Sequence, residues 1–174
     1  YVQFGRYMQR LLHADLGTSF QTGRPVLDDI IQYFPATIEL ATMSLIVSII
    51  IGIPLGILSA VYRNSLVDHF SRVLSLIGVS MPVFWLGLVL LLIFYFKLGW
   101  FPEPGRLDIM LIEPERITGM LLFDSLIALD FEVFWDALKH IVLPASVLGL
   151  YGLAGIARIV RSSMLDVLSQ EYIK

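Results

Sequence analysis

The sequence predicts an all-α protein, a polytopic helix bundle embedded in a membrane. Three long stretches without charge support this fold class: residues 40–62, 73–96 and 141–157. At about 1.5 Å per helical residue, the first two would cross a hydrocarbon layer of roughly 30 Å, and the third would nearly do so. Composition agrees, since 57% of the 174 residues are hydrophobic and 16% are charged, with a mean hydropathy of +0.79. Because lipid offers the backbone no hydrogen-bond partner, each stretch must be helical.

The chain divides into an outer segment and a membrane domain. Residues 1–36 are expected to form an extracytoplasmic segment at the membrane interface. Residues 37–174 are expected to form a partial transmembrane domain, with spans at about 37–62, 73–96 and 141–160. The chain opens at Tyr1 without an initiator Met and without the pattern of a signal peptide, so it is expected to be an internal fragment.

The basic residues predict how the chain threads the membrane. Three spans leave four connecting segments that alternate between the two sides. The second and fourth segments are short and dense in positive charge, from Arg63, Arg72, Arg158, Arg161 and Lys174. The positive-inside rule therefore predicts that residues 63–72 and 161–174 are cytoplasmic. Residues 1–36 and the carboxylate-rich loop 97–140 are predicted to lie outside.

The outer segment contains two amphipathic stretches. Apolar residues recur at helical spacing from the start of the chain, at Phe4, Met8, Leu11 and Leu12. A shorter helix is predicted over residues 25–34, because the fixed φ of Pro25 suits a first turn. Both helices are expected to lie on the membrane surface as packing and anchoring elements.

Small side chains form a stripe along the first span. The stripe falls at every fourth position and includes a GxxxG pattern: Ser44, Ser48, Gly52, Gly56 and Ala60. Such a face lets a second helix approach closely. Stripes of this kind are common in polytopic proteins, so the pattern favours helix packing over a transport role. Pro54 cannot donate a backbone hydrogen bond, and it predicts a bend.

The second span contains polar and helix-breaking residues within 73–96. Proline at position 82, after Ser80, frees a backbone carbonyl, and the indole N–H of Trp85 needs a partner. A conduit between helices could use such groups, although a structural kink satisfied by neighbouring helices is the slightly favoured interpretation. Glu39 lies near the outer surface at the start of the first span, and an interfacial role is favoured there over a proton relay.

The outer loop ends in a third amphipathic stretch, which leads into the third span. Asp130 is predicted to cap a surface-lying helix whose apolar residues are Phe131, Phe134, Trp135 and Leu138. The third span then repeats the small-residue pattern at Ala145, Gly149, Gly152 and Ala157. Close helix packing is again the favoured interpretation.

Several chemistries lack their sequence signatures. The histidines at positions 13, 69 and 140 fall in separate connecting segments without metal spacing, and the chain has no cysteine. No G-x-S-x-G elbow and no G-x-x-x-x-G-K-[ST] phosphate loop occurs, so neither a catalytic residue nor ATP hydrolysis is predicted for this chain. No basic patch interleaved with aromatic residues indicates nucleic-acid binding.

Two long blocks of the sequence resemble a known family. The first comprises Asp15-Leu16-Gly17-Thr18-Ser19-Phe20, Gly23-Arg24-Pro25-Val26 and Pro35-Ala36-Thr37-Ile38-Glu39-Leu40. The second comprises His140-Ile141-Val142-Leu143-Pro144-Ala145, Ala157-Arg158, Arg161-Ser162-Ser163-Met164-Leu165-Asp166-Val167-Leu168 and Glu171-Tyr172-Ile173-Lys174. Between them lie Ser80-Met81-Pro82-Val83-Phe84 and Leu98-Gly99-Trp100-Phe101-Pro102. In this order, and over essentially the whole chain, they resemble the permease subunits of bacterial dipeptide and oligopeptide ABC importers. Nickel and glutathione importers share this permease type, so the solute stays open.

The resemblance implies the transmembrane domain of a type I ABC importer in the bacterial inner membrane. The implied partners are a second permease subunit, two cytoplasmic ATPase subunits and an extracytoplasmic substrate-binding protein. ATP and Mg would be bound by the ATPase subunits, and no cofactor is expected in this chain. In such subunits a cytoplasmic coupling helix docks on the ATPase, and its approach here would be Ser169, Gln170, Glu171, Tyr172, Ile173 and Lys174. The core of that loop and the family's first span are expected to be missing from this chain.

The implied mechanism is alternating access driven by the ATPase partners. Peptide backbone is polar and variable, so its path should present scattered, weak hydrogen-bonding groups, and the candidates are Ser80, Trp85 and Tyr151. Two other classes are weighed against it. An ion- or proton-coupled secondary transporter or channel subunit is disfavoured by the uncharged span interiors. An intramembrane enzyme would need a nucleophile with its base inside the bundle, and it is the weakest alternative.

Overall fold

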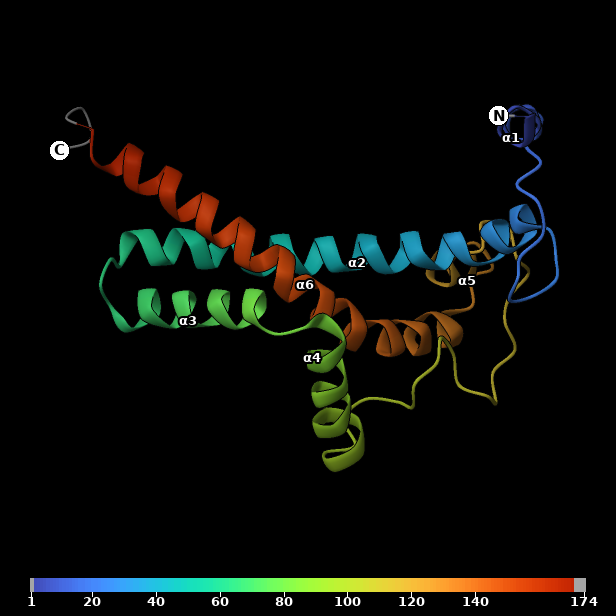
Figure 1. Ribbon diagram of the computed structural model, residues 1–174. Coiled ribbons are helices and arrows are strands. Elements are labelled where there is room, and N and C mark those ends of the chain that lie inside the picture. Colours follow the sequence, from blue (N-terminus) through green and yellow to red (C-terminus); the bar gives the residue numbers. More distant parts are fainter. Residues whose placement is uncertain (1, 171–174) are drawn as a thin grey trace.

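The computed structural model describes residues 2–170 (Figure 1), and every regular element in that range is a helix. In chain order they are α1 (Val2–Leu12), α2 (Val26–Val61), α3 (Leu66–Ser80), α4 (Val83–Leu90), the π-helix η1 (Leu91–Lys97), α5 (Leu121–Ile127) and α6 (Phe131–Leu168). Strand-like pairing within the same range is limited to an isolated bridge between Thr18 and Pro25. The all-α prediction is therefore confirmed.

Two helices dominate the structure, and both are longer than a membrane span requires. α2 has 36 residues and α6 has 38, and each is long and apolar enough to cross a membrane. At 1.5 Å per residue they measure about 54 and about 57 Å, against a hydrocarbon layer of about 30 Å. The amphipathic stretches 25–34 and 131–139, predicted as separate surface helices, are instead continuous with these spans. No break is needed there, because the ends of the two helices project beyond the hydrocarbon.

Prolines inside the long helices do not end them. Pro35 and Pro54 lie within α2, and Pro144 lies within α6. Each proline removes one backbone donor, but the neighbouring turns keep their hydrogen bonds. The bend predicted at Pro54 therefore does not interrupt α2, which continues to Val61.

The predicted span 73–96 differs from the observed structure, because it is divided between two helices. α3 ends at Ser80, and Met81 has extended backbone angles of φ −97° and ψ 138°. A residue that precedes proline is sterically disfavoured in the helical conformation, and the extended backbone of Met81 before Pro82 follows that preference, unlike the residues before Pro35, Pro54 and Pro144, which stay helical. Helix resumes at Val83, and the two parts are bent by 110° relative to each other. Pro82 thus ends one helix and begins another.

α2 and α6 lie side by side and run in the same direction (Figure 1). Gly149 of α6 lies against Ser44 of α2, and further along both helices Ala157 lies against Gly56. If both helices cross a membrane, the chain between them must return across it once. The broken pair of α3 with α4 and η1 is the segment available for that return, giving two continuous spans and one broken one.

Helix α5 covers one end of the bundle. α5 packs against α6, and a small apolar cluster joins them through Leu121, Leu122, Val133 and Ala137. Asp130 caps α6 as predicted, because its carboxylate accepts a hydrogen bond from the N–H of Val133 at 3.1 Å. Elsewhere many large apolar side chains of α2 and α3 are exposed, as expected for surfaces that face lipid.

Candidate functional site

The small-residue stripe of α2 lies in the interface with α6. The hydroxyl oxygen of Ser48 lies 2.8 Å from the carbonyl oxygen of Ser44 in its own helix and 2.8 Å from that of Gly149 in α6. A Cβ atom added at Gly56 would lie 2.8 Å from the carbonyl oxygen of Ala157, closer than real Cβ atoms approach. Glycine at this position is what allows the two backbones to come so close.

The other predicted packing residues lie along the same interface or are buried near it. A Cβ at Gly152 would lie 2.5 Å from the hydroxyl oxygen of Ser48, and a Cβ at Gly52 would lie 3.1 Å from a methyl carbon of Ile156. Ala60 is buried near the end of α2. We call the contact between α2 and α6 the seam, and it makes these two helices one closely packed pair.

The break between α3 and α4 is held by a residue from α6. The hydroxyl of Tyr151 donates a hydrogen bond to the carbonyl oxygen of Met81, the residue between Ser80 and Pro82. Pro82 has no N–H, and extended backbone at Met81 leaves carbonyl groups without helical partners. Tyr151 satisfies one of them across the bundle.

The three residues predicted to line a path are thus only partly brought together. Tyr151 contacts the backbone beside Ser80, and Ser80 itself is exposed at the end of α3. Trp85 lies on α4 with 46% of its surface exposed, and its indole N–H makes no hydrogen bond within residues 2–170. The structure therefore links Tyr151 with the break, while Trp85 faces outward.

A buried carboxylate joins three helices at one end of the bundle. Asp68 of α3 is 0% exposed, and its Oδ1 accepts from the hydroxyl of Ser59 in α2 at 2.6 Å. Arg161 of α6 forms a two-bond contact with it, Nε to Oδ1 at 2.9 Å and Nη2 to Oδ2 at 3.1 Å. Arg72, one turn along α3, adds a second guanidinium with Nη2 2.6 Å from Oδ2. We call these four residues the Asp68 cluster.

The Asp68 cluster satisfies a charge that would otherwise be costly to bury. Both carboxylate oxygens accept bonds from arginine, and Oδ2 also accepts from the backbone N–H of Asn64 at 3.0 Å. Paired and fully hydrogen-bonded burial of this kind fixes the positions of the partners. α2, α3 and α6 are therefore tied at one point through side chains alone.

At the opposite end, a second buried carboxylate holds a loop. Glu39 of α2 is 5% exposed, and its Oε2 lies 2.9 Å from Nη2 of Arg106 in the loop that follows η1. Its Oε1 accepts from the backbone N–H of Leu122, at the start of α5, at 2.6 Å. The interfacial role predicted for Glu39 is consistent with these contacts, which involve a loop arginine and a helix terminus.

Asp124 of α5 completes that end of the bundle. Its carboxylate accepts from the hydroxyl of Thr118 at 2.6 Å and from the backbone N–H groups of Thr118 and Gly119 at 2.8 and 2.9 Å. Burial raises the pKa of Asp124, but these hydrogen bonds outweigh it and hold the pKa below its ordinary value. The carboxylate therefore stays ionised and organises the loop that precedes α5. We call Glu39, Arg106 and Asp124, with the backbone groups they bind, the loop anchors.

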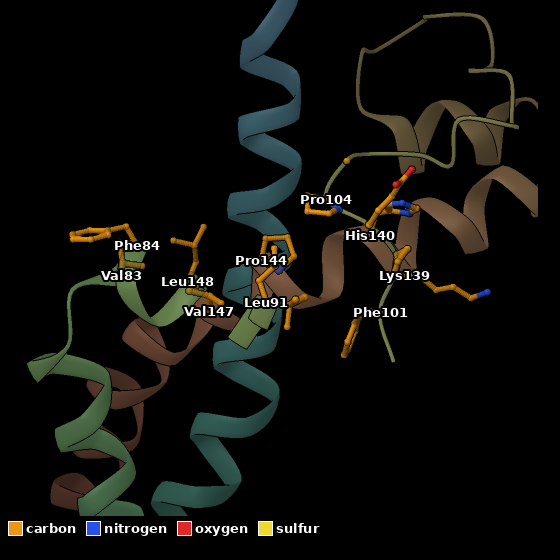
Figure 2. A pocket seen from close by; sticks show the side chains of 15 residues that line it. Val83, Phe84, Leu91, Phe101, Pro104, Lys139, His140, Pro144, Val147 and Leu148 are labelled. Carbon is orange, nitrogen blue, oxygen red and sulfur yellow. The ribbon is translucent and has the colours of Figure 1, made fainter. Parts of the chain in front are cut away.

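A cavity of about 480 Å³ lies between α4, the start of the loop and α6 (Figure 2). Its walls are mostly apolar, with Val83, Phe84, Pro144 and Val147 among them. His140 borders it, with Nδ1 2.9 Å from the carbonyl oxygen of Asp136 and 3.2 Å from its carboxylate. Because both of these groups accept, Nδ1 carries the proton.

The described part of the chain offers no group of three His, Asp or Glu side chains that could hold a metal ion. His140 is the one buried histidine of residues 2–170, and the carboxylate of Asp136 is 3.2 Å from its Nδ1, while Glu103 also lines the cavity. Lys139 extends its amine away from the other labelled side chains in Figure 2. A metal ion is therefore not assigned to this cavity.

The predicted approach to the coupling helix is only partly described. α6 ends at Leu168, and Ser169 caps it with its hydroxyl donating to the carbonyl oxygen of Asp166 at 2.8 Å. Gln170 follows as an exposed residue. Residues 171–174 of the predicted set lie outside the described range.

Sequence reasoning did not find the Asp68 cluster, Arg106 or Asp124. One signal was available, because Asp68 and Arg72 are spaced four apart on a helix, where opposite charges meet. Arg161 is 93 residues from Asp68, and Arg106 is 67 residues from Glu39. Nothing in the local pattern indicates such distant partners.

Comparison with known proteins identifies the family of the chain. The sequence profile of the family described as "Binding-protein-dependent transport system inner membrane component" matches residues 52–174. The chain belongs to this family. The matched range includes the last ten residues of α2 and all of α3, α4, η1, α5 and α6. The break at Met81 and the Asp68 cluster therefore lie within it, whereas Ser44 and Ser48 of the seam precede it.

Individual relatives align over the whole chain. It is 50% identical over 174 residues to the probable D,D-dipeptide transport system permease protein DdpB of Escherichia coli (strain K12), covering 51% of that protein. It is 45% identical over 174 residues to the dipeptide transport system permease protein DppB of Alkalihalophilus pseudofirmus, covering 52%. It is 42% identical over 175 residues to the di/tripeptide transport system permease protein DppB of Pseudomonas aeruginosa, again covering 52%. In each case all of this chain is covered, and the chain spans about half the length of the relatives.

Proposed function

We propose that this chain forms part of a permease subunit of an ATP-driven importer of short peptides. The observation that carries the proposal is the alignment with a probable D,D-dipeptide permease, which covers the whole chain at 50% identity. Two other relatives with similar coverage are named as dipeptide or di/tripeptide permeases, so the proposed solute class is the same in all three.

The arrangement of helices supports a role in alternating access. The seam packs α2 and α6 into one closely packed pair, whereas α3 and α4 are separated by an extended residue and a 110° bend. We propose that the broken segment moves relative to that pair as the path opens to one side and then the other. A nucleotide or solute drives this change only through unequal affinity for the two states.

The proposed path lies along the broken segment. Ser80 and the carbonyl groups around Met81 are hydrogen-bonding groups in an otherwise apolar region, and Tyr151 already engages one of them. Weak, scattered groups of this type suit a backbone whose side chains vary. Trp85, exposed on α4, is proposed to line the path together with neighbouring elements of the assembled transporter.

The proposed partners follow from the family to which the chain belongs. A second permease subunit, two ATPase subunits and an extracytoplasmic substrate-binding protein would complete the transporter, with ATP and Mg held by the ATPases. Residues 169–174 would approach the coupling helix at the cytoplasmic side, and the loop 97–130 with α5 would face outward. No catalytic residue is proposed for this chain.

The proposal is tested by reconstitution. The full-length subunit containing this chain is assembled with its partner permease and ATPases in proteoliposomes, and uptake of a labelled dipeptide is measured with the binding protein present. Uptake is expected to require ATP and to stop when the ATPase carries a substitution of its phosphate-binding lysine. Uptake that continues without ATP and collapses with an ion gradient would instead support the ion-coupled transporter.

The lining residues are tested in the same assay. Ser80→Ala, Trp85→Ala and Tyr151→Phe are each expected to lower uptake, with Trp135→Ala as a control, because Trp135 is an exposed tryptophan outside the proposed path. If all three variants transport dipeptide at the rate of the unchanged protein, the path does not run along these side chains.

A further inference from the structure

A second cavity lies at the end of the bundle that holds the Asp68 cluster. Four arginines surround it. The cavity is about 640 Å³ in volume and opens where the turn after α2 meets α3 and α6. Its polar wall is made by Arg63, Arg72, Arg158 and Arg161, together with Asn64, Ser71 and Ser75. We call it the arginine pocket.

The charge of the arginine pocket is strongly unbalanced. No carboxylate among residues 2–170 lines it. Asp68, buried behind the wall, is shared by Arg72 and Arg161, so four positive charges and one negative charge leave a net charge of three. Asp166, the acidic residue of α6 that follows Arg161 in the sequence, does not line the pocket. A site of this sign attracts an anion.

Two of the arginines are held in place before any anion binds. Arg72 and Arg161 each bond to Asp68 through Nε and Nη2, and their Nη1 groups make no hydrogen bond within the described range. Their side chains are 51% and 23% exposed, so part of each guanidinium is accessible. A guanidinium fixed in this way loses little freedom when it binds an oxyanion.

The other two arginines have no competing partner. Arg63 and Arg158 are exposed, and neither forms an ion pair or a side-chain hydrogen bond with another residue of the range 2–170. Four guanidinium groups around one cavity are a suitable set of donors for a phosphate group, whose oxygens accept several N–H bonds at once.

The apolar surroundings favour a phosphate that is attached to a lipid. Leu76 lines the pocket and is exposed, and it belongs to a row of exposed apolar residues along α3 that includes Phe70, Val73 and Ile77. Leu165 and Ala157 of α6 form the facing wall. A free anion gains nothing from these side chains, whereas an acyl chain lies along them while its headgroup reaches the arginines.

We propose that the arginine pocket binds the phosphate headgroup of an anionic phospholipid, with the acyl chains along the exposed apolar row of α3. The pocket lies at the end of the bundle that is predicted to be cytoplasmic, where anionic headgroups and helix ends meet. This site does not depend on which solute the transporter carries.

The test uses the assembled transporter in neutral detergent after removal of bound lipid. Phosphatidylglycerol and phosphatidylcholine are titrated separately, and binding is followed by thermal unfolding and by native mass spectrometry. Phosphatidylglycerol is expected to bind and to stabilise the complex more than phosphatidylcholine does. The double variant Arg63→Gln/Arg158→Gln is expected to weaken that binding about 25-fold, at about fivefold per arginine.

Three controls separate the possible results. Arg10→Gln removes an exposed arginine of α1 that is far in sequence from the arginine pocket. This variant is expected to leave phosphatidylglycerol binding unchanged. Arg63→Lys/Arg158→Lys retains the charge, so binding of this variant close to that of the unchanged protein would show that the fold is intact and that charge supplies most of the attraction. Comparable elution volumes on size-exclusion chromatography exclude misfolding of the glutamine variant.

Other outcomes would overturn the proposal. Equal binding of the two lipids, or phosphatidylglycerol binding that the double glutamine variant does not weaken, would exclude a phospholipid site here. Inorganic phosphate that stabilises the complex as strongly as phosphatidylglycerol would assign the pocket to a soluble anion. If the double variant binds phosphatidylglycerol normally but loses its ATPase subunits, the pocket is a protein contact.

Discussion

The two ends of the bundle are fastened in different ways. In the Asp68 cluster, side chains from α2, α3 and α6 bind one another directly, and both charged partners of the carboxylate are arginines on helices. Among the loop anchors, Glu39 and Asp124 bind backbone N–H groups of Leu122, Thr118 and Gly119, and only Arg106 supplies a charge. One end therefore ties helices to helices, and the other ties a loop to helices. The difference teaches that equally buried carboxylates can have different structural roles.

The largest expected effect comes from removing Asp68. Asp68→Ala leaves Arg161 and Arg72 beside a cavity without their shared counter-charge, and it frees three helices at once. We expect the free energy of unfolding to fall by roughly 3–5 kcal/mol, as is typical when one partner of a buried ion pair is removed. Thermal unfolding of the assembled transporter in detergent measures this. Asp166→Ala, at an exposed carboxylate on α6, is the matched control.

An unchanged unfolding temperature in Asp68→Ala would contradict the role given to the Asp68 cluster, which is to tie α2, α3 and α6 together. It would mean that the seam alone holds α2 and α6 together and that the cluster adds nothing. A loss of the same size in Asp166→Ala would also count against the interpretation, because that residue makes no ion pair with any residue of the range 2–170.

A smaller and more local effect is expected at Glu39. Glu39→Gln keeps an oxygen that can accept from the N–H of Leu122 but loses the charge that pairs with Arg106. We expect a loss of about 1.5–3 kcal/mol, confined to the loop and α5. Hydrogen exchange should therefore accelerate around residues 106–122 and stay unchanged in α3. Faster exchange throughout α2, α3 and α6 would show that Glu39 also supports the helix bundle. Glu115→Gln, at an exposed position in the same loop, serves as control.

The smallest expected effect is the pH dependence that Asp124 contributes. Its pKa is depressed in the folded state, below the ordinary value of 3.8. The stabilisation it supplies is therefore fully present above 3.8 and is lost as the pH falls through the lower folded value. Unfolding curves between neutral and acidic pH should show this loss in the unchanged protein and a smaller one in Asp124→Asn. Identical pH profiles for the two proteins would mean that the carboxylate is not ionised as the geometry requires.

Much of the fold could be predicted from the sequence, because its elements follow from local patterns. The uncharged stretches predicted the helical membrane class, and the repeated small residues from Ser44 to Ala60 predicted a face suited to close helix contact. The cap at Asp130 was equally local. Each of these signals lies within a few residues of the structure it predicts.

What the sequence did not predict depends on conformation or on distant partners. The sequence around Pro82 predicted a kink within one span, whereas the extended backbone at Met81 divides it into two helices. The continuity of α2 with residues 26–34 was missed because an amphipathic end and an apolar middle were read as two helices. Arg161 could not be matched with Asp68, because the two residues are 93 positions apart and no local pattern links them.

The seam also has a consequence for the order of synthesis. Ser48 and its partner Gly149 are separated by 101 residues, so at about 5–20 residues per second α2 leaves the ribosome roughly 5–20 s before that part of α6 exists. Throughout this interval the hydroxyl of Ser48 already has an acceptor, the carbonyl of Ser44 in its own helix. The nascent α2 helix can therefore stay in lipid with the hydroxyl of Ser48 already hydrogen-bonded. When α6 is synthesised, its packing adds the second contact to Gly149, and no unsatisfied polar group has to be paired first.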